Sequence, residues 1–423
     1  MPLCVELEAK IKRGAMRGEY DAIVIGGGPA GATAAMALAS AGWRVAVVEK
    51  QRFPRRKVCG EFISLTNWPI LGPMGLSENL QAAAGPEVTH FAVFSGNSSV
   101  AAELPLSFGK MGERGRALTR DKLDALLLNH ARMCGAEILQ PWKALRVTRD
   151  NEGVECELQC CESHEKKILR AKVAIAAQGS WEGNPFEAAA RERVRASDLF
   201  GFKAHFRGVN LAEGLMPLLS FQDGYGGMVH CQDGLASLSC CIRRSRLDRL
   251  PLDFGESAGE RVLAHIKATC PAIAPVLTNA VREGAWLAAG PVRPGIRARY
   301  DWRAFFVGNA AGEAHPVIAE GISIAIQSAW LMSGILAPLK ERLSDARTIN
   351  EAGRLYSTAW SRAFATRIRA SALIAHWAMR PALARATLPF FQRWPNVLKW
   401  FAQAAGKASI SIQAETQLQK AAT

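Results

Sequence analysis

Apolar and polar positions near the start of the chain predict a strand, a turn, a helix and a second strand. Residues 20–25 are a short run rich in β-branched side chains, and an alanine-rich stretch then ends at Ala41, before Gly42. A second short apolar run follows at residues 45–48. Short apolar runs on either side of a helical stretch are typical of an α/β unit. We therefore expect residues 20–50 to form the centre of an α/β domain.

Farther along, polar and apolar positions alternate, which is typical of antiparallel strands with one covered face. The alternation predicts strands within residues 87–105, 145–148, 154–158, 200–207, 217–221, 227–231 and 235–242. The glycine-rich string at residues 223–227 is interpreted as a hairpin turn. Helices are predicted from Thr119 to Gly135 and over residues 256–268.

The last part of the chain is predicted to be helical. Residues 321–339 are 19 positions without a charge, which is long enough to cross a membrane. Gln327 and three serines favour a helix buried inside the protein instead. Beyond it, interruptions are expected at Pro381, Pro389 and Pro395.

Composition and charge distribution narrow the class of protein. The 423 residues are 49% apolar and 21% charged, which indicates a globular chain of two domains with an extension. The net charge is +14, and residues 352–414 carry nine Lys or Arg and no Asp or Glu. Cations interleaved with aromatic residues suit a membrane surface or the mouth of an apolar cavity, but they also suit packed helices with solvated arginines. Nucleic-acid binding is disfavoured because no recognised module accompanies the charge.

The spacing of the cysteines and the composition of residues 1–18 indicate in which cellular compartment the protein is expected. Ten cysteines are spread without a C-x-x-C motif, and two pairs are adjacent, at residues 160–161 and 240–241. This spacing fits neither a disulfide framework nor a zinc site, so we expect reduced thiols and no metal. Residues 1–18 form a polar lead-in without the pattern of a signal peptide. A cytoplasmic location is the expectation.

Three glycines after the first strand predict a dinucleotide site. Gly26, Gly28 and Gly31 have G-x-G-x-x-G spacing, which allows a tight turn, a close approach to pyrophosphate, and close packing of helix on sheet. The helix then points its unpaired N–H groups and positive dipole end at the anion. Glu49, eighteen residues after Gly31, is placed to accept both hydroxyls of an adenosine ribose.

The loop after this unit carries a resemblance. Residues 51–64 read QRFPRRKVCGEFIS, directly after the pair Glu49-Lys50. A phosphate turn, an EK pair and F-P-R-x-K-x-C-G-E resemble the FAD-dependent reductases of the geranylgeranyl reductase group, relatives of aromatic-ring hydroxylases and flavin-dependent halogenases. The resemblance implies that Lys50 and Lys57 bind FAD and that Cys59 lies beside the flavin. A small buried cysteine and a solvated cationic run are the alternatives.

Further parts of the chain resemble the same group. Arg120, followed by x-x-L-D, is implied to contact the pyrophosphate, and Ala-Gln-Gly-Ser at residues 177–180 resembles A-D-G-x-x-S, with Gln178 in place of aspartate. The chain is therefore expected to return there to the first sheet. Residues 308–322 resemble G-D-A-A-G-x-x-x-P-x-x-G-E-G-I, with Asn309 replacing an aspartate that holds the ribityl chain. Gly321 and Ile322 then begin a helix whose positive end faces the flavin. The two motifs together favour FAD over NAD.

The predicted fold is α/β: a discontinuous FAD-binding Rossmann-like (ββα) domain (19–85, 110–182 and 298–345), an antiparallel-sheet substrate domain (86–109 and 183–297), and a basic helical extension (346–423). The predicted function is an FAD-dependent oxidoreductase that transfers hydride at flavin N5 to or from a lipophilic isoprenoid- or polyketide-like substrate. A monooxygenase hydroxylating an aromatic substrate and a membrane-attached flavin scaffold with little turnover are the alternatives. Halogenation is disfavoured, since W-x-W-x-I-P does not occur. Cys59 is the candidate catalytic residue, the electron donor is NAD(P)H or a redox protein, and peripheral membrane contact is expected from the C-terminal helices.

Overall fold

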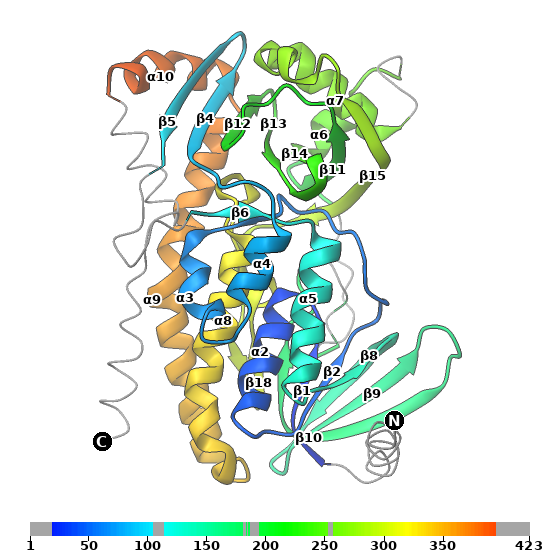
Figure 1. Cartoon of the computed structure of the whole chain (residues 1–423). Helices are drawn as coiled ribbons and strands as arrows, with labels where there is room; N and C mark the ends of the chain where they lie inside the picture. The colour runs from blue at the N-terminus through cyan, green and yellow to red at the C-terminus, as the bar shows by residue number, and fades with distance from the viewer. Residues whose placement is uncertain are drawn as a thin grey trace, which may run out of the picture.

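The computed structural model describes residues 19–104, 114–180, 183, 185–186, 194–252 and 257–394 (Figure 1). The predicted lead-in 1–18 and the extension beyond Trp394, with Pro395, lie outside the described residues. The described chain forms two large sheets, one above the other in Figure 1, with a long helix running beside both, and two small sheets of two strands each, β3-β6 and β16-β19.

The first sheet has a parallel centre in the strand order β17-β18-β10-β1-β2-β7, and the hairpin β8-β9 pairs antiparallel with β10. Its strands are β1 (Glu19–Ile25), β2 (Val45–Val48), β7 (Glu137–Leu139), β8 (Trp142–Arg149), β9 (Val154–Cys160), β10 (Lys166–Ala176), β17 (Tyr300–Asp301) and β18 (Ala304–Phe306). The return of the chain at Gln178 occurs as expected, because β10 lies parallel to β1 with Ala176 opposite Ile25. The carboxyl ends of the parallel strands β1, β2 and β10 point toward the second sheet (Figure 1).

Three helices pack together beside the first sheet: α2 (Pro29–Ser40), α5 (Arg120–Met133) and α8 (Gly321–Leu336). The small side chains of α2 let it lie between the other two, and ten of its twelve residues are buried. The helical run Gly321–Arg342 is long and apolar enough to cross a membrane, yet 67% of its most apolar stretch is buried inside the structure. The structure therefore places it as a packed core helix.

The second sheet has the strand order β15-β11-β14-β13-β12-β4-β5. Its strands are β4 (His90–Ser95), β5 (Ser98–Glu103), β11 (Leu199–Arg207), β12 (Leu215–Phe221), β13 (Gly224–His230), β14 (Ala236–Arg243) and β15 (Val281–Val292). All neighbours are antiparallel except β4 and β12. One face packs on α7 (Ala258–Thr269), whereas Val93, Leu218 and Tyr225 on the other face join the core of the first domain. The second sheet thus forms a roof over the first domain.

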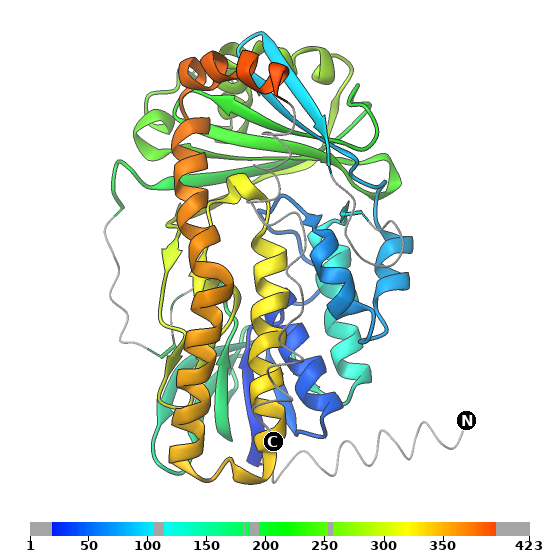
Figure 2. The same ribbon diagram turned by 90° about the vertical axis from the view of Figure 1, so that its left-hand side faces the viewer.

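The C-terminal helices α9 (Ala346–Ala378) and α10 (Pro381–Arg393) connect the two layers. Figure 2 shows α9 running the length of the molecule and α10 crossing the edge of the second sheet. The shorter elements are β3 (Phe62–Ile63), β6 (Arg116–Ala117), β16 (Gly295–Ile296), β19 (Gly312–Glu313), α3 (Trp68–Leu71), α4 (Ser77–Ala83) and α6 (Arg244–Leu247). Each of the nine cysteines in the described ranges is a free thiol.

Two local predictions were wrong. Residues 224–227 belong to strand β13 and not to a turn, which lies at Gln222 and Asp223. The glycines serve packing, because a Cβ on Gly224 would lie 2.1 Å from the Phe221 ring. Pro389 does not interrupt α10. It lies on the exposed side of the helix, while buried Leu388 and Phe391 hold the turn on the second sheet.

Candidate functional site

A single continuous cavity between the two sheets brings both glycine motifs together. Gly28 and Gly321 line the same cavity, which encloses about 1710 Å³ including its open mouth. Nine of the eleven predicted site residues line it: Gly26, Gly28, Glu49, Lys57, Cys59, Arg120, Asn309, Gly321 and Ile322.

The two predicted residues outside the lining are Gly31 and Lys50. Gly31 has a structural role beneath the turn, because a Cβ there would lie only 1.8 Å from the carbonyl oxygen of Gly26. Gly26 itself has a φ of 103°, which favours glycine. Gly28 is different: the atoms nearest to a Cβ there are the guanidinium nitrogens of Arg120 at 3.7 Å and Arg55 at 3.8 Å. The turn therefore presents Gly28 and the N-terminus of α2 to the cavity.

Two arginines, Arg55 and Arg120, line this end of the cavity. Arg120 donates from Nε and Nη2 to the fully buried carboxylate of Asp124, at 2.7 and 2.8 Å. Arg55 Nη2 lies 3.5 Å from the same carboxylate and 3.9 Å from Glu49. Among the described residues, the buried Nε of Arg55 has no hydrogen-bond partner. Two guanidiniums and a helix N-terminus around Gly28 fit the pyrophosphate of FAD.

Glu49 lies beside the glycine turn at the same end of the cavity. Its carboxylate accepts the backbone N–H groups of Gly27 and Gln51, both at 2.9 Å. These bonds hold the side chain in one orientation, and each oxygen keeps a lone pair for a ribose hydroxyl. The residues present therefore fit the adenosine half of FAD.

Arg55 was not predicted from the sequence as a site residue. Its position beside Gly28 leads to a first testable prediction. Arg55→Ala is expected to raise the Kd for FAD by roughly 10- to 100-fold, because a hydrogen bond to a charged group contributes about 1.5–3 kcal/mol. Titration of the apoprotein with FAD, followed by flavin fluorescence, measures this. Arg52→Ala is the matched control, since Arg52 pairs with Glu162 on the surface. Equal Kd values for the two variants would remove Arg55 from the site.

The other end of the cavity is built by residues 307–325. Gly321 begins α8, and no atom lies within 4 Å of the position of its absent Cβ. The N-terminus of α8 therefore faces open space with its positive dipole end, which would stabilise negative charge on a reduced flavin. Asn309 lines the cavity, and its amide nitrogen donates to Glu313 at 3.0 Å.

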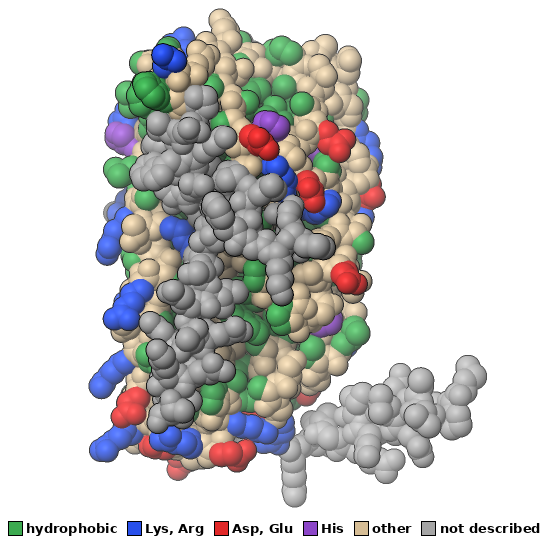
Figure 3. All heavy atoms as spheres, turned by 60° about the vertical axis from the view of Figure 1, so that its left-hand side comes forward, with side chains coloured by type: hydrophobic (Ala, Val, Ile, Leu, Met, Phe, Trp, Pro, Cys, Tyr) green, Lys and Arg blue, Asp and Glu red, His purple; other side chains and the backbone are tan. Residues whose placement is uncertain are grey.

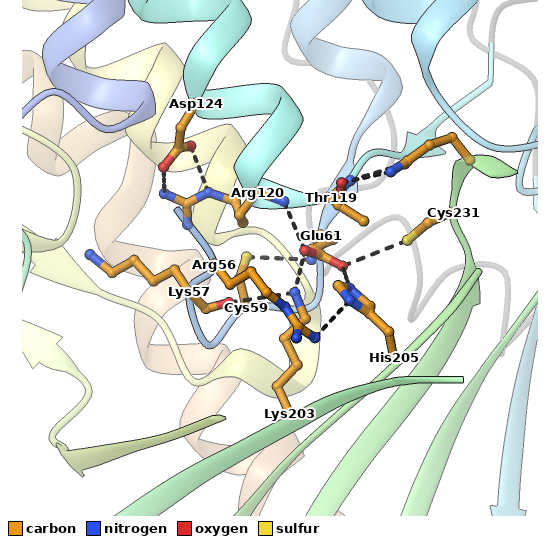
Figure 4. Close-up of polar contacts among 11 residues, drawn as sticks. Arg56, Lys57, Cys59, Glu61, Thr119, Arg120, Asp124, Lys203, His205 and Cys231 are labelled. Carbon is orange, nitrogen blue, oxygen red and sulfur yellow. Dashed lines mark hydrogen bonds and ion pairs between the residues drawn. The ribbon is translucent and has the colours of Figure 1, made fainter. Parts of the chain in front are cut away.

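A buried ionic cluster lies behind the loop that carries Cys59 (Figure 4). The carboxylate of Glu61 pairs with Lys203, accepts the backbone N–H of Arg120 at 2.8 Å, and accepts His205 Nε2 at 2.7 Å. Arg56 Nη2 lies 2.9 Å from His205 Nδ1. Because a guanidinium can only donate, Nδ1 accepts this bond, and the ring proton sits on Nε2. Lys203 and Glu61 are both fully buried.

This cluster ties the flavin loop to the second sheet. Lys203 and His205 lie two positions apart on β11, so both point from one face of that strand. Burial alone would raise the pKa of Glu61, but the hydrogen bond from His205 and the charge of Lys203 outweigh it and lower the pKa to about 2. Glu61 is therefore ionised at neutral pH and acts as an acceptor, not as a proton donor.

The cluster also orients Cys59, which is half-buried in the cavity wall. The backbone N–H of Glu61, a residue with φ of 64°, points at Cys59 Sγ across 3.4 Å. Arg120, whose side chain interacts with Cys59, donates its backbone N–H to the Glu61 carboxylate. Glu61 thus links the position of the thiol to that of Arg120.

The side of the cavity formed by the second sheet is uncharged. Its lining residues on β4, β11, β12, β13, β14 and β15 include Phe91, Met216, Leu218, Tyr225, Gly227 and Val229, and none carries a charge. Tyr225 Oη lies 3.3 Å from His315 Nδ1. Burial lowers the pKa of His315 to about 4, so this imidazole is neutral at pH 7. Among the described residues, the charged groups that line the cavity all lie outside the second sheet.

Comparison with known proteins agrees with this geometry. The FAD binding domain family matches residues 19–347. Conditioned medium factor receptor 1 of Dictyostelium discoideum is 27% identical over 339 residues, 74% of this chain and 62% of the receptor. Digeranylgeranylglycerophospholipid reductase 1 of Methanothermobacter thermautotrophicus is 24% identical over 349 residues, 80% of this chain and 82% of the reductase. The structure of flavin-dependent brominase Bmp2 has a TM-score of 0.71 at 17% identity, covering 96% of this chain and 98% of the brominase, and shows the fold alone.

The chain spans less than two thirds of the length of the receptor, and matches to two further curated relatives cover 31% and 33% of their length. The matches confirm the predicted α/β FAD-binding fold and the resemblance to reductases, hydroxylases and halogenases.

Proposed function

Because this chain belongs to the FAD-binding domain family, and FAD is its cofactor, we propose that it is an oxidoreductase of lipophilic, isoprenoid- or polyketide-like molecules. The uncharged wall that the second sheet turns toward the cavity supports this substrate class. An apolar wall favours a ligand without charged groups, because a buried unpaired charge is strongly disfavoured.

The division of the cavity suggests a role for each part of the chain. Bound FAD supplies hydride transfer at its N5 atom. Arg55, Arg120 and the N-terminus of α2 would hold its pyrophosphate, and the N-terminus of α8 would hold its ring end. The apolar wall would orient the substrate and exclude water. Cys59 is the side chain that we propose to contact cofactor or substrate, and NAD(P)H or a redox protein is the proposed electron donor.

An anaerobic assay tests this proposal. The purified protein is loaded with FAD and reduced without oxygen, and unsaturated isoprenoids, quinones or extracted lipids are added while flavin absorbance is followed. We expect one class of lipophilic acceptor to restore the oxidised spectrum. Turnover only with oxygen, with oxygen consumed in proportion to an aromatic substrate, would replace the reductase with a monooxygenase. A protein without a flavin spectrum after FAD is added would contradict both.

Gly227 provides a prediction about the substrate wall. It lies on β13 between Tyr225 and Val229, and a Cβ there would face the cavity, with only the carbonyl oxygen of Pro217 close by, at 3.2 Å. Gly227→Val is expected to lower substrate-dependent reoxidation roughly tenfold or more while the Kd for FAD stays unchanged. Gly227→Ala should have a smaller effect. Unchanged reoxidation in the valine variant would place the substrate elsewhere.

A further inference from the structure

The outer face of α10 combines exposed apolar side chains with arginines. The inner face packs on the second sheet through Ala384, Leu388 and Phe391. Leu383 and Phe390 are seven residues apart, with Ala386 between them, so they share the opposite face. Leu383 is 45% exposed, Phe390 is 53% exposed, and Trp394 at the end of the helix is 57% exposed. Large apolar side chains gathered on one helix face indicate an interaction surface.

The charged residues of α10 and of its N-cap position are all arginines. Arg380, Arg385 and Arg393 are exposed, and no ion pair recorded between described residues involves them. The wider segment, residues 352–414, contains no Asp or Glu. Arg347, Arg354, Arg362 and Arg369 are also exposed on α9 at intervals of about two turns. Figure 3 shows Lys and Arg side chains spaced along one edge of the molecule.

We propose that α10 docks on the surface of an anionic lipid bilayer. Its charge is complementary to such a surface, and Leu383, Phe390 and Trp394 project far enough to insert among the lipid headgroups. This combination favours a bilayer over a protein partner, because a bilayer takes up both apolar side chains and many cations without a specific complementary shape.

The position of α10 links this surface to the cavity. Ser95 on β4 donates from Oγ to the carbonyl of Pro381 at 3.1 Å, and Ser220 on β12 donates to the carbonyl of Ala378 at 2.7 Å. The same two strands supply Phe91, Met216 and Leu218 to the uncharged wall. Docking through α10 would therefore hold that side of the cavity near lipid. This consequence rests on the proposed function, whereas the docking itself does not.

Vesicle flotation of the full-length holoenzyme tests the proposal. We expect the protein to float with vesicles of phosphatidylcholine and phosphatidylserine at low salt, and with phosphatidylcholine alone only weakly. The triple variant Leu383→Ser, Phe390→Ser and Trp394→Ser should lower the partition coefficient roughly tenfold or more. The double variant Arg385→Glu, Arg393→Glu should bind the anionic vesicles more weakly, and its binding should change less with salt concentration. FAD content and melting temperature check that the variants fold.

The matched control carries Met133→Ser, Ile168→Ser and Leu252→Ser, which are 73%, 56% and 81% exposed elsewhere. Its binding should equal that of the wild type. The proposal is overturned if the wild type does not float, if the control loses as much binding as the α10 variant, or if binding depends on charge alone and the serine variant binds normally. Flavin reoxidation by lipophilic acceptors in detergent is measured in parallel, so that an active enzyme that fails to bind vesicles refutes docking only.

Discussion

Gly31→Ala is expected to unfold the turn that begins α2 and to abolish FAD binding. The added methyl group would lie 1.8 Å from the carbonyl oxygen of Gly26 and 3.2 Å from the side chain of Ala177. Both neighbours are held by the central sheet, since Ala177 donates its N–H to Ile25. Because backbone cannot move aside as a flexible side chain can, a loss of stability of about 4–5 kcal/mol is expected. Urea unfolding of the apoprotein measures this loss.

Gly28→Ala and Gly321→Ala are the informative comparisons. Neither added methyl group meets an atom closer than 3.7 Å, and neither glycine has a positive φ. Both apoproteins should therefore unfold within about 1 kcal/mol of the wild type. Both should still bind FAD at least about tenfold more weakly, because the methyl groups enter the space that the cofactor needs. A Gly28→Ala variant with wild-type affinity for FAD would show that the pyrophosphate does not approach this turn.

The contrast between these glycines shows what could be predicted from the sequence. G-x-G-x-x-G spacing reports contacts between residues a few positions apart, so it identifies Gly26, Gly28 and Gly31 without knowledge of the fold. The second motif likewise contains its own strand end and the helix start at Gly321. The existence of one cavity between them could be expected only from the resemblance, because Gly28 and Gly321 are 293 positions apart in the sequence.

The residues that sequence reasoning missed act through long-range contacts. Arg55 was one of three cations in a row, and nothing in the sequence of this loop shows that Arg52 pairs with Glu162 while Arg55 turns toward Asp124. Lys203 and His205 meet Glu61 across more than 140 residues of sequence. The available signal was weak: two basic residues alternate with apolar ones on a strand whose other face is buried. The polar face of β11 could therefore be predicted from the sequence, but its partner Glu61 could not.

The glycine-rich string in β13 was misread for a related reason. Glycine marks both turns and places where another group approaches closely, and the sequence does not distinguish them. At Gly226 a Cβ would lie 2.9 Å from the Cβ of Cys240, so the residue serves packing between neighbouring strands. At Gly227 the same absence of a side chain leaves space in the cavity. One short string thus serves packing on one face of the sheet and cavity shape on the other.

The Glu61 cluster leads to the second large effect. Glu61→Gln and Lys203→Met are each expected to lower the free energy of unfolding by about 3–5 kcal/mol, because each leaves one buried charge without its partner. The double variant removes both charges, and glutamine keeps an oxygen for the backbone N–H of Arg120. It should therefore be more stable than either single variant, with a coupling energy of roughly 2–3 kcal/mol. Urea unfolding with and without FAD measures all four proteins.

The pH dependence of the free energy of unfolding distinguishes the loss of the buried ion pair from a general packing defect. Glu61 has a folded pKa of about 2, below the ordinary value of 4.5, so its contribution is complete above about pH 4.5 and is lost as the pH falls toward 2. The stability gap between the wild type and Glu61→Gln should narrow over that range. A gap that is constant with pH, or a double variant whose loss equals the sum of the single losses, would mean that Glu61 and Lys203 stabilise the protein independently. In that case Glu61 would not be the link that carries the position of β11 to Arg120 and Cys59.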